Sequence, residues 1–138
     1  MPIRIDLLDR YQRRMMDIVG MALPLIASRQ SDADMIGLKY LRREMIETLA
    51  SYDRLIHEMT KAAVARCDDR EQLRVYELRE HCSSMRETYD AFHTHWVERQ
   101  VLENWAEYRL SAIVTMKRIR NDVVASRELD ASFADRPA

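Results

Sequence analysis

Helix-breaking residues are almost missing from the middle of this chain. Between Leu25 and Arg136 the sequence has no proline, and Gly37 is its only glycine. Apolar residues recur every three or four positions over the same stretch, which is the spacing of one face of an α-helix. A chain of 138 residues with so few breaks is therefore expected to be nearly all helical, and its length suits one domain with its own core.

Four amphipathic helices follow from the apolar spacing. A polar loop ends the first helix, and a short turn separates the second from the third. Asn104 followed by Glu107 resembles a capping box, which favours a break before Trp105 rather than one very long helix. The expected helices are 3–27, 34–66, 70–99 and 105–127.

Short connections make neighbouring helices antiparallel, so the sequence predicts an all-α, up-down four-helix bundle. Residues 1–127 form its single domain, and residues 128–138 are expected to be a loose C-terminal tail because they contain small and turn-forming residues. The second and third helices look longer than the other two, so they form a long central hairpin.

The end of this hairpin is expected to overhang the rest of the bundle. Apolar residues on an overhang would form an exposed patch, and such patches usually mark an interface. The sequence therefore predicts a homodimer built around the hairpin; the alternative is that the first helix or the C-terminal tail covers the patch. The interface candidates are Ile56, Met59, Ala63, Leu73, Val75 and Leu78.

Charge and hydropathy narrow the range of partners. The net charge is −1, so no overall field attracts the protein to nucleic acid or anionic lipid. The longest apolar run, 18–27, is too short to span a bilayer. Acidic residues precede this run, which does not suit a signal peptide. Cys67 and Cys82 lie too far apart on the expected hairpin for a disulfide, so we expect reduced thiols and a cytoplasmic protein.

Aromatic residues gather around the junction of the third and fourth helices. Two interpretations are open: the cluster could line a pocket for a small ligand, or it could close one end of the bundle as a plug, which is the commoner role. The ligand-pocket candidates are Tyr89, Phe92, Trp96, Trp105 and Tyr108.

The four histidines raise the question of a metal site between helices. A dinuclear carboxylate bundle uses two Glu-x-x-His motifs, and none of these histidines has Glu three residues before it. Other ligand pairs at helical spacing remain possible for iron or zinc. The metal candidates are His81, Asp90, His93, His95 and Glu98.

Two segments, Leu78-Arg-Glu-His-Cys-Ser-Ser-Met and Phe92-His-Thr-His-Trp-Val-Glu, resemble hemerythrin-like proteins. The resemblance implies a four-helix bundle whose histidines and carboxylates bind two irons. The family's His-x-x-x-Glu motif is absent, because Glu98 follows His95 one residue too soon and His81 is followed by Met85. The resemblance therefore implies a degenerate member that has lost most of its ligands.

A second resemblance comes from the segment Asp90-Ala-Phe-His93. It resembles the metal-binding Asp-x-x-Phe-His motif of ligand-sensing helical domains in a bacterial repressor family, although it is one residue shorter. This resemblance implies a sensor that binds a metal or small molecule near the aromatic junction.

The leading functional hypothesis from the sequence is a non-enzymatic interaction or regulatory protein that pairs with itself, with another protein as a further candidate partner. The alternative is a degenerate hemerythrin-like or ligand-sensing bundle. An enzyme is the least expected class, because no acid–base or nucleophile set converges at useful spacing. His81 and Cys82, for example, are adjacent on a helix and point in different directions.

Overall fold

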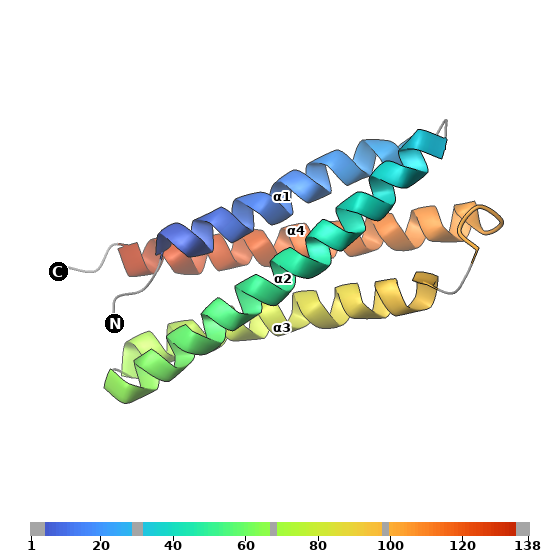
Figure 1. Cartoon of the computed structure of the whole chain (residues 1–138). Coiled ribbons are helices and arrows are strands. Elements are labelled where there is room, and N and C mark those ends of the chain that lie inside the picture. The colour runs from blue at the N-terminus through green and yellow to red at the C-terminus, as the bar shows by residue number, and fades with distance from the viewer. Residues whose placement is uncertain (1–4, 29–31, 67–68, 98–99, 135–138) are drawn as a thin grey trace.

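The computed structural model describes residues 5–28, 32–66, 69–97 and 100–134. Its helices are α1 (Ile5–Ala27), α2 (Asp32–Arg66), α3 (Asp69–Val97) and α4 (Trp105–Ala134) (Figure 1). The predicted all-α four-helix bundle is confirmed, and so is the break between the third and fourth helices.

The helices form a ring in which each packs against two neighbours. α1 and α3 both pack against α2 and α4, whereas the described parts of the diagonal pairs make no close backbone contact. Successive helices run in opposite directions, so α1 begins and α4 finishes at the end of the bundle where α2 finishes and α3 begins (Figure 1). The connection between α3 and α4 lies at the opposite end, beside the start of α2.

The core follows the apolar stripes that the sequence predicts. On α3, seven apolar residues that recur every three or four positions are all buried: Val75, Leu78, Cys82, Met85, Tyr89, Phe92 and Trp96. Methionines of the other helices, among them Met15, Met45 and Met116, belong to the same core, where side chains must fit gaps of irregular shape. The flexible, polarisable methionine side chain suits such irregular gaps. The fully buried core residues include Met15, Met45, Tyr52, Ile56, Leu78, Met85 and Ile119.

Helix α4 is longer than the sequence predicted. It continues past residue 127 to Ala134, Leu129 packs against the core, and Asp130 is only 7% exposed. The prediction of a loose tail is therefore wrong for residues 128–134, and residues 135–138 lie outside the described part of the chain. Composition suggested a tail, but packing against the bundle overrides weak local preferences.

The predicted overhang of the hairpin is also wrong. Five of the six interface candidates are buried within the single chain, and only Leu73, at 65% exposed, remains on the surface. The long α4 ends beside this part of the hairpin, together with the start of α1 (Figure 1). The homodimer stays a prediction, without support from this patch. The buried candidates are Ile56, Met59, Ala63, Val75 and Leu78.

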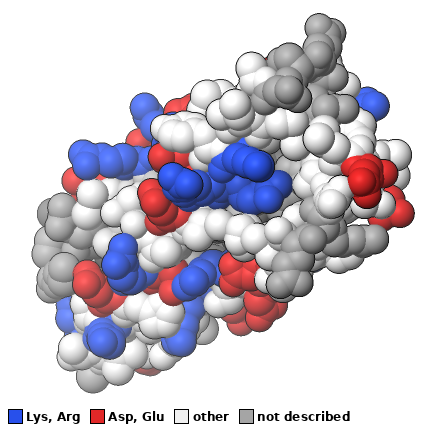
Figure 2. Space-filling view, turned by 45° about the vertical axis from the view of Figure 1, so that its right-hand side comes forward, with Lys and Arg blue, Asp and Glu red and all other residues white. Residues whose placement is uncertain are grey.

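Charges of both signs are distributed over the surface. Figure 2 shows basic and acidic side chains interleaved over much of the face that it presents. Some form ion pairs between helices, such as Arg14 with Glu44 at 3.0 Å and Arg86 with Asp53 at 2.8 Å. Among the described residues, no helix combines the length and the apolar character needed to cross a membrane.

Substitution of Gly20 by Ala is expected to stabilise the bundle by about 0.5–1 kcal/mol, because glycine in a helix interior carries an entropic cost. A Cβ atom at Gly20 would meet no atom within 4 Å, whereas one at Gly37 would lie 3.3 Å from Leu25 Cδ1. Gly37→Ala should therefore increase the stability of the bundle by less than Gly20→Ala does. Urea unfolding monitored by circular dichroism measures both changes; a loss of stability in Gly20→Ala would contradict the prediction.

Candidate functional site

The structure brings the five aromatic ligand-pocket candidates together at the end of α3 and the start of α4. Tyr108 is their centre: its ring centroid lies 5.7 Å from that of Phe92, 5.2 Å from that of Trp96 and 5.5 Å from that of Trp105. Tyr89 extends the cluster, 5.7 Å from Phe92. Tilted and edge-on contacts at these distances are favourable for aromatic pairs.

This aromatic cluster is packed too tightly to be a pocket itself. Tyr89, Phe92, Trp96 and Tyr108 are between 2% and 6% exposed. The cavity that remains against three of these rings has a volume of about 20 Å³, roughly enough for one water molecule. The cluster is therefore a plug that closes this end of the bundle, as the second interpretation of the sequence had it.

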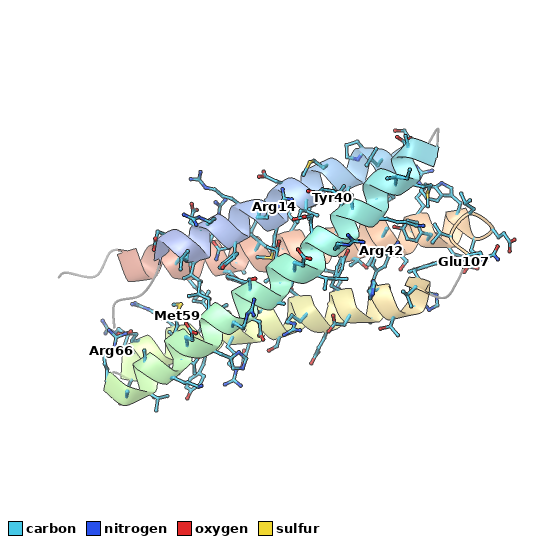
Figure 3. The ribbon with its side chains drawn as sticks, in the orientation of Figure 1. Arg14, Tyr40, Arg42, Met59, Arg66 and Glu107 are labelled. Carbon is cyan, nitrogen blue, oxygen red and sulfur yellow. The ribbon has the colours of Figure 1, made fainter. Side chains whose placement is uncertain are left out.

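Arg42 of α2 completes the cluster, and the sequence analysis did not identify it. Its Nη2 donates a hydrogen bond to the Tyr108 hydroxyl at 3.0 Å. Its guanidinium carbon lies 5.8 Å from the ring centroid of Phe92 and 5.6 Å from that of Tyr108, within range of cation–π attraction. Figure 3 shows Arg42 on the side of α2 that is turned toward α3.

Beside Arg42 a cleft of about 390 Å³ opens between the start of α2, the end of α3 and the turn that follows. We call it the α2–α3 cleft. The residues that line it are mainly apolar. Two of these residues, Val97 and Leu102, lie at its rim and are 58% and 57% exposed. This volume and lining are typical of a small-molecule site. The lining residues are Met35, Leu38, Lys39, Arg42, Trp96, Val97, Gln100, Val101 and Leu102.

Local structure explains how the cleft is positioned. Met35, Lys39 and Arg42 are spaced four and three residues apart, so they share one face of α2. On the side of the cleft that faces α2, the backbone N–H of Asn104 donates to the backbone carbonyl of Val101 at 3.2 Å. The backbone carbonyl of Asn104 in turn accepts from the backbone N–H of Tyr108 at 3.0 Å. This turn begins α4 and fixes the wall that carries Val101. The spacing on α2 was visible in the sequence, but the facing wall was not.

The metal candidates within the described residues do not converge, and the buried Nδ1 of His93 has no hydrogen-bond partner among them. His81 lies on the α3–α4 side, where its Nδ1 is 2.9 Å from Asp122 Oδ1, whereas the exposed His95 contacts Trp96 at a centroid distance of 4.9 Å. Asp90 is exposed, and Glu98 lies outside the described residues. Within the part of the chain that the structure describes, no group of three or more His, Cys, Asp or Glu is arranged to hold a metal ion.

His81 and Asp122 resemble part of a catalytic relay, but the third member is placed differently. Ser84 donates to Asp122 Oδ2 at 3.2 Å, so the serine bonds to the carboxylate rather than to the imidazole. A serine nucleophile needs a hydrogen bond to the base that removes its proton. The geometry therefore suits a link between α3 and α4 rather than nucleophilic catalysis by Ser84.

The Cys82 thiol is likewise unsuited to nucleophilic chemistry. Burial raises its pKa to about 12, and the nearby Asp53 carboxylate adds to the increase. The thiol donates weakly to Asp53 Oδ1 at 3.6 Å, while Arg86 donates to the other oxygen at 2.8 Å. A reactive thiol needs the opposite environment, one that favours the thiolate. Cys67 lies outside the described residues.

Comparisons with protein-family models, with curated proteins and with solved structures give no significant match to this chain.

Proposed function

We propose that this protein is a non-enzymatic binding protein that holds a small, mostly apolar molecule in the α2–α3 cleft. The observation that carries the proposal is the cleft itself, with about 390 Å³ of space and six apolar lining residues out of nine. Apolar walls with a few convergent polar groups are the usual form of a small-molecule site.

The proposal develops the ligand-sensing alternative from the sequence analysis. The leading hypothesis, an interaction protein, depended on an apolar hairpin patch whose residues are mostly buried in one chain. Support for binding comes instead from the exposed apolar rim at Val97 and Leu102, since exposed apolar surface next to a cleft favours a ligand that covers it. The plug beneath it gives the cleft a rigid floor that includes Trp96.

Nile red, a neutral apolar dye, tests the proposal. We expect saturable binding of one dye per chain, and about tenfold weaker binding to Leu102→Glu, because a charge at the rim opposes an apolar ligand and removes leucine contacts. Dye fluorescence during titration measures both affinities.

Leu110→Glu is the matched control. Leu110 is 68% exposed on α4 and does not line the cleft, so this variant should bind the dye as the wild type does. The proposal is wrong if the wild type shows no saturable binding, or if the two variants lose affinity equally.

A further inference from the structure

Arg42 is a partly buried cation to which the described residues bring no carboxylate. Among the described residues, none of the acidic side chains lies within ion-pair distance of Arg42, and its buried Nε has no acceptor. Arg14 of α1, in contrast, has the Glu44 carboxylate at 3.0 Å. The other arginines with described ion pairs are Arg13 and Arg127 with Asp9, Arg66 with Glu71, and Arg86 with Asp53.

The surroundings of Arg42 orient its guanidinium but leave its charge uncompensated. The rings of Phe92 and Tyr108 lie within 6 Å of it, and the Tyr108 hydroxyl accepts one of its five N–H groups. The hydroxyl and the rings are neutral. A partly buried cation is costly without a counter-charge, so an anion beside Arg42 is favoured.

We infer that the ligand of the α2–α3 cleft carries a carboxylate that binds Arg42, with its apolar body against Met35, Leu38 and Val101. This inference rests on the function proposed above. A guanidinium presents a planar fork of donors that matches the two oxygens of a carboxylate. Lys39, one turn before Arg42 on the same wall of the cleft, adds a second positive charge.

The size of the cleft limits the apolar body. Its volume of about 390 Å³ lies near the lower end of the range for small-molecule sites, roughly 300–1,000 Å³. A medium-chain fatty acid or a one- or two-ring aromatic acid therefore matches the space, and a long-chain lipid exceeds it.

Three probes with the same alkyl chain test the headgroup: octanoate, octanol and octyl phosphate. Each is titrated against bound Nile red, and the fluorescence of Trp96 and Trp105, the only tryptophans of the chain, reports binding directly. We expect octanoate to bind at least tenfold more tightly than octanol and more tightly than octyl phosphate. Arg42→Gln should remove the preference for octanoate over octanol while Nile red still binds.

Arg43→Gln is the matched control, because Arg43 is exposed and adjacent on α2 but does not line the cleft; it should keep the preference. Arg42→Lys retains the charge without the fork and should lose most of the preference. If Nile red binds and octanol matches octanoate, the carboxylate inference is overturned while the proposed function stands. Tighter binding of octyl phosphate would overturn the choice of carboxylate, and failure of Nile red itself to bind would overturn the proposed function.

Discussion

Leu78→Ala is expected to destabilise the folded chain by about 2–5 kcal/mol, the range for truncating a large buried aliphatic side chain. Leu78 is fully buried on α3 in the single chain, although the sequence suggested it as an interface residue. Its loss should therefore lower the free energy of unfolding of the monomer, measured by urea denaturation at several protein concentrations.

Leu73→Ala gives the comparison within the same helix. Leu73 is 65% exposed, so its truncation should change stability by less than about 0.5 kcal/mol. If Leu78 belonged to a dimer interface, its substitution would instead make the unfolding midpoint more dependent on protein concentration. A small, concentration-dependent effect of Leu78→Ala would show that the side chain is not in the monomer core.

A buried polar network near the end of α4 leads to the second large effect. Gln12 of α1 is 1% exposed, and its Nε2 donates to the Tyr52 hydroxyl at 3.0 Å. The Gln12 Oε1 and Asp130 Oδ1 atoms are both buried without a partner among the described residues. Two unpaired acceptors in one buried network favour a protonated carboxyl, which can donate a hydrogen bond.

Burial raises the pKa of Asp130 to about 6 from its ordinary value of 3.8. The charge of Asp9 on α1 adds to the increase, whereas the hydrogen bond with Gln12 and the charge of Arg127 oppose it. At pH values between 3.8 and about 6, Asp130 therefore holds a proton in the folded chain that it has released in the unfolded chain. Ionisation of Asp130 therefore lowers stability as the pH rises through this window.

Asp130→Asn is expected to become more stable relative to the wild type as the pH increases from 4 to 7, by a total of about 2–3 kcal/mol. Asparagine cannot ionise, and its amide can donate to Gln12. The measurement is the difference between the two urea unfolding free energies at each pH, in which the titrations of the other carboxylates largely cancel.

Asp90→Asn is the control for this pH series, because it makes the same chemical change at a residue that is exposed on α3. A constant difference for Asp130→Asn would mean that the Asp130 carboxyl is ionised in the folded state over the whole range.

Local sequence signals were sufficient for the helices but not for their ends. The near absence of proline and glycine between Leu25 and Arg136, together with the turn signal at Asn104, predicted where helices form and where α3 and α4 separate. The end of α4 was missed because small residues after Arg127 are compatible with a tail or with a helix. Packing of Leu129 and burial of Asp130 make the difference, and neither contact is local in sequence.

The candidate site was predicted in part. Aromatic spacing on α3 and α4 correctly grouped Trp96, Phe92 and Tyr108, because helical periodicity puts such residues on one face. Arg42 was missed, since it comes from another helix, 66 positions from Tyr108, and a single arginine carries no pattern. The cleft was missed for the same reason.

The sequence by itself determined the all-helical class and the buried stripes, because a continuous 3.6-residue periodicity without breakers permits little else. Tertiary structure alone decided which apolar residues are covered, which side chains surround Arg42, and where space remains beside the plug. Those properties depend on distances between side chains of different helices, and no local preference encodes such distances. The long run with almost no helix breakers therefore defines the bundle, while the short turn at 100–104, which interrupts this run, builds one wall of the proposed site.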